Sequence, residues 1–212
     1  MCVAEPNSRH LAWIEAGRTV AMAVVVWTHA SNMVFFREGD FSLLPLFSST
    51  LVCFAVPAFF IISGYLAGNY EAHRPAGIPF SRRPVRQMTK LAPAFLAWNT
   101  ISLLVLNRFY SVPLWTLHSL LDLLTGTMQL YFIFAMLQIL GLLCLTNPFA
   151  TPRRLNAWAL MAGISTLAFY TVSSLLFHTV PPHDYIFELT ALKVFPVWGG
   201  FYFLGAWLSR HD

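Results

Sequence analysis

The feature that most constrains the fold is a series of long apolar segments that hold few charges. Several of these runs reach or approach the ~20 residues that an α-helix needs to cross a ~30 Å hydrocarbon core. Of all residues, 57% are hydrophobic and only 10% are charged, where an ordinary soluble domain has about 25% charged residues. The pattern predicts an all-α, polytopic membrane protein in which residues 1–212 form a single domain.

Six segments are expected to span the membrane, because stretches rich in Pro, Gly, Asn and charge separate them. The expected spans are 12–36, 44–69, 89–107, 127–146, 156–177 and 191–209. Residues 112–126 form a shorter amphipathic stretch, which is expected to lie in the membrane interface rather than to cross it. The sequence therefore predicts a transmembrane helix bundle of about six spans.

Positive charge is divided unevenly between the two sets of connecting segments. With the N-terminus in the cytoplasm, three of the 13 Lys and Arg residues (Arg37, Arg108 and Lys193) fall outside and the others fall inside. Lys and Arg accumulate in cytoplasmic loops, so both termini are predicted to be cytoplasmic, in a multi-pass protein of the cell (inner or plasma) membrane. Topology accounts for the net charge of +4, and no nucleic-acid partner is expected.

The Cys and His residues do not have the spacing of a metal or redox site. The three cysteines are scattered and suggest no disulfide framework. The polar residues of the outer segment 178–188 lack the regular spacing of zinc ligands. No metal and no permanently bound cofactor is expected.

Arg18 and His29 lie eleven residues apart in the first expected span. Eleven residues are almost three helical turns, so the two side chains point within about 20° of each other, roughly 16 Å apart along the axis. A charge inside a span costs several kcal/mol and persists where it has a function or a partner. Glu15 is placed to pair with Arg18, and His29 is suited to take a proton from a hydroxyl nucleophile. In the alternative, Arg18 reaches lipid phosphates and His29 binds a helix carbonyl.

The second expected span contains a run of functional interest, Pro57-Ala-Phe-Phe-Ile-Ile-Ser-Gly-Tyr65. Pro57 frees a backbone carbonyl and permits a kink. Ser63 and Gly64 allow close helix approach, and Tyr65 places a hydroxyl near the cytoplasmic edge. Taken alone, these residues are typical of packing between membrane helices.

A basic loop is expected over residues 70–90, where Arg82, Arg83 and Arg86 are followed by Lys90. A cytoplasmic Arg cluster can anchor to anionic lipid. In the alternative, the guanidinium groups pair bidentately with phosphate, and a nucleotide-containing donor such as acyl-coenzyme A (acyl-CoA) would suit such a site. Both readings stay open on the residues alone.

The order of these motifs resembles that of the acyltransferase 3 family, integral-membrane enzymes that acylate cell-surface glycans. The matching features are Arg18-x10-His29, the run Pro57–Tyr65, Arg83-x-x-Arg86 followed by Pro93, the cluster Gln129–Phe132 and the closing segment Phe201–Leu208. Together they cover most of the chain.

The resemblance implies an O-acyltransferase that moves an acetyl or succinyl group from cytoplasmic acyl-CoA to an envelope polysaccharide or glycolipid. It implies that Arg83, Arg86 and Lys90 bind acyl-CoA, that His29 and Arg18 are catalytic, and that Ser63, Gly64 and Tyr65 line a tunnel or hold its helix. Family members generally have more spans, so the chain is expected to be the N-terminal part, completed by a second copy or by a missing C-terminal half. The alternatives are a transporter of polysaccharide or anionic solute, which would use the same Arg and His as a relay, and an inactive remnant.

Overall fold

The computed structural model describes residues 12–27 except 15 and 26, and residues 43–74, 77–110, 113–126, 130–177 and 193–211. These residues contain helices and no β-strand, which confirms the predicted all-α class for this part of the chain. They fall into two compact units. Unit 1 comprises Met1–Ala72 with Phe201–Asp212, and unit 2 comprises His73–Gly200.

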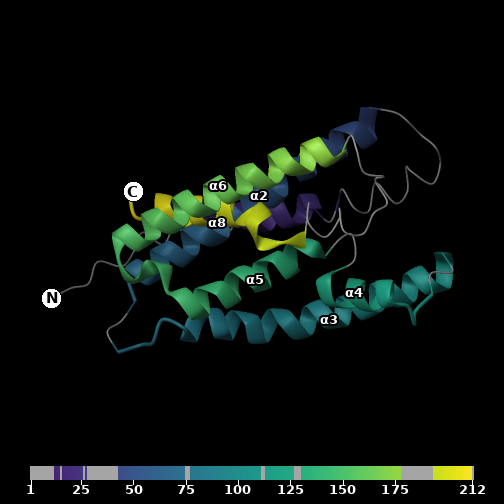
Figure 1. Ribbon diagram of the computed structural model, residues 1–212, viewed down its shortest axis with the longest axis horizontal. Helices are drawn as coiled ribbons and strands as arrows, with labels where there is room; N and C mark the ends of the chain where they lie inside the picture. Colours follow the sequence, from purple (N-terminus) through teal and green to yellow (C-terminus); the bar gives the residue numbers. More distant parts are fainter. Residues whose placement is uncertain are drawn as a thin grey trace. The chain divides into compact units, whose positions relative to one another are not determined.

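Unit 1 contains helix α2 (Leu43–Ala72) and the second half of helix α8 (Phe195–Leu208), which are labelled in Figure 1. The two helices meet backbone to backbone at glycines. A Cβ on Gly64 would lie 1.8 Å from the carbonyl oxygen of Tyr202, and a Cβ on Gly205 would lie 1.9 Å from that of Ile61. Only glycine permits this approach, and small residues play the same part where helices associate in membranes.

Unit 2 is built around helix α3 (Arg82–Tyr110), which spans about 43 Å at 1.5 Å per residue. Helix α5 (Tyr131–Thr146) packs along α3, and the nine-residue helix α4 (Leu117–Thr125) packs against α3 as well (Figure 1). A 3₁₀ turn, η1 (Pro148–Ala150), leads into helix α6 (Pro152–Phe177). Apolar side chains of α3 and α5 form the interior of the unit, including Phe95, Leu103, Ala135, Ile139 and Leu140.

Two helices of the described part are long and apolar enough to cross a membrane, over Arg82–Arg108 and Pro152–Leu175. Helix α6 buries only a narrow stripe, which includes Leu155, Ala162 and Thr166, and exposes most of its large apolar side chains. That distribution suits a helix surrounded by hydrocarbon rather than by water. The six-span bundle and the cytoplasmic position of the termini stay predictions.

The basic stretch that was expected in a loop lies in a helix, so that expectation was wrong. Helix α3 starts at Arg82, seven residues before the expected span. Proline within the first helical turn costs no hydrogen bond, because the N–H groups of that turn have no intrahelical acceptor. Pro84 therefore does not delay the helix, whose first bond runs from the Val85 N–H to the Ser81 carbonyl at 3.0 Å.

Helix α4 occupies the stretch that was expected to be short and amphipathic. Leu117, Leu120 and Leu124 share one exposed stripe of this helix. Its opposite side packs inward through Ser119, whose backbone N–H is capped by the Thr116 hydroxyl at 3.1 Å. A location in the membrane interface stays a prediction.

Candidate functional site

Arg18 lies in unit 1 on a helical stretch that packs against α2. Its guanidinium carbon is 5.9 Å from the ring centroid of Phe59, within the range of a cation–π contact. On the following turns Ala21 and Val25 are buried, while the Arg18 side chain itself is exposed. The structure thus places Arg18 over an aromatic ring of the Pro57–Tyr65 run. Its predicted partners Glu15 and His29 lie outside the described residues.

The Pro57–Tyr65 run is continuous helix in the middle of α2. Gly64 is buried against α8, and Ser63 and Tyr65 are half-buried on either side of it. Because the backbones touch at Gly64, the positions of its neighbours are fixed relative to α8 within unit 1. Gly64 therefore lies in a close contact between two helices, and the lining of a tunnel by Ser63 and Tyr65 stays a prediction.

Four cations lie on one face of the first turns of α3. At 100° per residue, Arg82, Arg83, Arg86 and Lys90 fall within an arc of about 100°. Arg82, Arg86 and Lys90 are exposed, and Arg83 is half-buried. The structure therefore brings the three residues predicted to bind acyl-CoA onto one surface and adds Arg82 to them.

Ring contacts stabilise the segment that leads into α3. The Arg74 guanidinium lies 6.0 Å from the centroid of Phe80 and donates a hydrogen bond to the carbonyl of Ile78. The Phe80 ring is 5.8 Å from that of Phe149 in η1. Within unit 2, this contact holds the start of α3 close to the turn that precedes α6.

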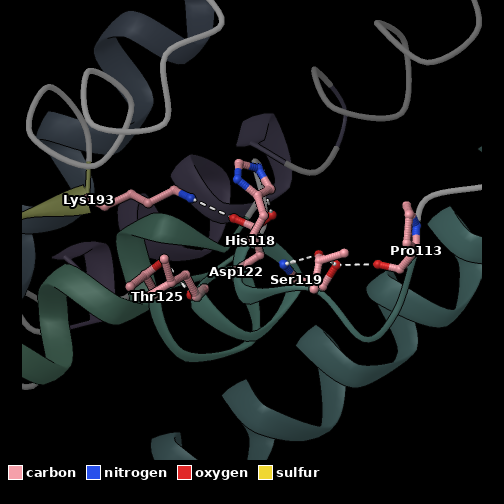
Figure 2. Close-up of polar contacts among 8 residues, drawn as sticks. Pro113, His118, Ser119, Asp122, Thr125 and Lys193 are labelled. Carbon is pink, nitrogen blue, oxygen red and sulfur yellow. Dashed lines mark hydrogen bonds and ion pairs between the residues drawn. The ribbon is translucent and has the colours of Figure 1, made fainter.

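Sequence reasoning missed a buried ion pair in unit 2, shown in Figure 2. The Lys193 ammonium lies 3.1 Å from Asp122 Oδ1, and the Asp122 side chain keeps 20% of its surface exposed. Lys193 itself is almost fully buried, and its expected position on the outer side of the membrane stays a prediction. Its partner is 71 residues away in the sequence, so no local pattern could have indicated the pair.

Polar groups from two other helices complete this region. The Gln138 amide donates to the Lys193 carbonyl at 2.9 Å and accepts from the Phe195 N–H at 3.0 Å. The Asn99 amide, fully buried on α3, donates to the Leu123 carbonyl of α4 at 3.1 Å. These bonds satisfy groups that would otherwise destabilise an apolar interior, and they connect α3, α4, α5 and the start of α8.

His118, Ser119 and Asp122 belong to one short helix, but they do not form a catalytic triad. The Ser119 hydroxyl donates to the Pro113 carbonyl, so its proton is not directed at an imidazole (Figure 2). His118 Nε2 lies 3.7 Å from Asp122 Oδ2, beyond normal hydrogen-bond distance. Among the described residues, no group of three or more His, Cys, Asp and Glu side chains is placed to hold a metal ion.

The fold and these surfaces define an all-helical protein with apolar helices of membrane length and a basic face on one of them. Residues 11–212 match the family model described as "Acyltransferase domain", so the chain belongs to the acyltransferase 3 family. The resemblance inferred from the motifs is thereby confirmed. No curated protein and no solved structure shows significant similarity to the chain.

Proposed function

We propose that the protein is a membrane O-acyltransferase that moves an acyl group from cytoplasmic acyl-CoA to a hydroxyl of an envelope polysaccharide or glycolipid. The observation that carries this proposal is the family match over residues 11–212, which supports acyl transfer as the class of reaction. The two apolar helices of membrane length support a location in the bilayer. The basic face of α3 supports an anionic donor.

The reaction breaks the thioester C–S bond of acyl-CoA and forms an ester C–O bond to the acceptor. No oxidation or reduction takes place. The proton of the attacking hydroxyl passes to His29 as general base and ends on the sulfur of the departing CoA. Arg18 would stabilise negative charge that develops near His29, and its contact with the Phe59 ring supports a fixed position for the guanidinium.

The donor fits the basic face of α3 through its phosphates. Guanidinium groups bind phosphate oxygens in a bidentate manner, which an ammonium cannot do. Arg83 and Arg86 lie one turn apart on this face and Lys90 follows one turn later. Cations on successive turns suit the diphosphate of CoA, while the acyl end extends toward the apolar part of the protein.

Membranes that contain the protein should transfer label from acyl-CoA to the glycan fraction, and substitution of the proposed residues should abolish transfer. We expect His29→Ala to lower the rate at least about 100-fold, as is typical for loss of a general base. Arg83→Ala should raise the KM for acyl-CoA. Arg108→Ala, at the opposite exposed end of α3, is the matched control and should keep the wild-type rate.

The amount of each variant in the membrane fraction must equal that of the wild type. Release of CoA without a labelled glycan would contradict the proposed acceptor. Solute flux without any acylated product would contradict acyl transfer altogether and favour a transporter.

A further inference from the structure

Two further arginines lie at the same end of unit 2 as the basic face of α3. Arg153 and Arg154 occupy the first turn of α6 and are exposed. The first turn is fixed because the Arg154 N–H donates to the Thr151 hydroxyl at 3.2 Å. Figure 1 shows the starts of α3 and α6 at one end of the unit. We name this region the basic end, and its members are Arg82, Arg83, Arg86, Lys90, Arg153 and Arg154.

The chain path keeps the two arginine groups close together. The Phe80 and Phe149 rings are 5.8 Å apart. Phe80 lies two residues before Arg82, and Phe149 lies four residues before Arg153. Only a few residues therefore separate each arginine group from one shared ring contact, so a single ligand can reach both.

The described residues of unit 2 hold little negative charge. Among the described residues of His73–Gly200, Asp122 is the one acidic side chain, and it pairs with Lys193. Leu123, which follows Asp122 in the sequence, accepts a hydrogen bond from Asn99 of α3. Asn99 is thirteen residues from Arg86, or about 20 Å along the helix, so Asp122 lies far from the basic face. The exposed cations Arg82, Arg86, Lys90, Arg153 and Arg154 attract a ligand that carries several negative charges.

We infer that Arg153 and Arg154 bind the ribose 3′-phosphate of CoA, while the α3 face binds the diphosphate. This inference rests on the proposed function, because it assumes a CoA donor. CoA carries a diphosphate and, across the ribose ring, a separate monophosphate. Two groups of cations on two helices match two separate phosphate groups, and a bidentate guanidinium suits each.

The test is a comparison of CoA with 3′-dephospho-CoA, which lacks only that phosphate. The full-length protein is reconstituted in phosphatidylcholine vesicles, and the Kd of each compound is measured. Wild type should bind CoA about 10-fold or more tightly than 3′-dephospho-CoA, as expected for charge-assisted hydrogen bonds. In R153Q/R154Q this ratio should fall to about 1, with the Kd for 3′-dephospho-CoA unchanged.

Arg108→Gln is the matched control, since it removes an exposed arginine from the opposite end of α3 and should keep the wild-type ratio. A thermal unfolding midpoint equal to that of the wild type shows that R153Q/R154Q is folded. An unchanged ratio in R153Q/R154Q would overturn the inference and leave the proposed function standing. Failure of wild type to bind CoA would overturn both.

A second set of vesicles distinguishes the phosphate of CoA from that of a lipid headgroup. Phosphatidylglycerol is added to the phosphatidylcholine. The preference for CoA over 3′-dephospho-CoA is then measured again for wild type and for R153Q/R154Q. If R153Q/R154Q differs from wild type only in these anionic vesicles, the arginines serve the headgroup and the inference is overturned. If R153Q/R154Q already differs from wild type in vesicles of pure phosphatidylcholine, CoA is supported as the ligand.

Discussion

At the scale of single residues, the contact between Arg18 and Phe59 connects two segments of unit 1. The ring faces a cation that the reaction proposed here requires. A cation–π contact at an exposed site contributes about 0.5–1 kcal/mol. That is enough to bias the position of a long side chain, although it is too little to decide whether the protein folds.

Phe59→Leu should lower the rate of acyl transfer about 3-fold to 5-fold, because it keeps an apolar side chain but removes the ring face. The rate is measured with labelled acyl-CoA in membranes. Phe59→Tyr keeps the ring and should keep the rate. In an Arg18→Ala background, Phe59→Leu should have no further effect, and an equal fall there would mean that the ring acts without the guanidinium.

Lys193→Met should lower the free energy of unfolding by about 3 kcal/mol, because Asp122 would lose the cation that pairs with it. Unfolding in a mild detergent, followed by tryptophan fluorescence, measures the change. The double variant D122L/K193M should recover most of the loss, since both charges are then replaced by apolar groups. A double variant as unstable as Lys193→Met would contradict a role for the pair itself.

At the scale of the elements, the close approach of α2 and α8 depends on glycine at two positions. Gly64→Ala should lower the free energy of unfolding by about 1–3 kcal/mol or more, because the new methyl group would overlap the Tyr202 carbonyl. Gly163→Ala on α6 is the matched control, as its Cβ meets no atom within 4 Å. It should be neutral or stabilising by up to about 1 kcal/mol, and thermal unfolding of both variants tests the contrast.

The sequence predicted the positions of three helices well, because each of these three is marked by a long apolar run. The expected spans 127–146, 156–177 and 191–209 correspond to α5, α6 and α8 within a few residues at each end. The start of α3 was misplaced, because a basic, proline-containing stretch has the composition of a loop. The pairing of helices was beyond the sequence, since apolar periodicity does not say which helix covers a given face.

The candidate site was predictable only where residues are close in the sequence. Arg83, Arg86 and Lys90 share a face because their spacing follows the helical period. Asp122, Gln138 and Lys193 come from three separate segments, and their contact depends on the tertiary fold. Charge counting assigned Lys193 to one side of the membrane, but it could not indicate that the side chain is buried against Asp122.

At the scale of the whole molecule, the proposed topology places the two ends of unit 2 on opposite sides of the membrane. In a cysteine-free background, Trp115→Cys and Ala150→Cys provide two exposed labelling sites. A membrane-impermeant maleimide should label Trp115→Cys in right-side-out vesicles and Ala150→Cys only in inverted vesicles. The reverse pattern would contradict the predicted orientation, and labelling of both from one side would contradict the span assigned to α5.

The amide of Gln138 has a consequence for how the molecule assembles. It gives one bond to a carbonyl and takes one from an N–H two residues further along the chain. If α8 were shifted by one residue, the amide NH₂ and the amide oxygen of Gln138 would both lose their hydrogen-bond partners. The cost is about 1–3 kcal/mol for each group that is left without a partner in an apolar environment. Gln138 therefore favours one register for the packing of α8 and disfavours the registers that are shifted by one residue.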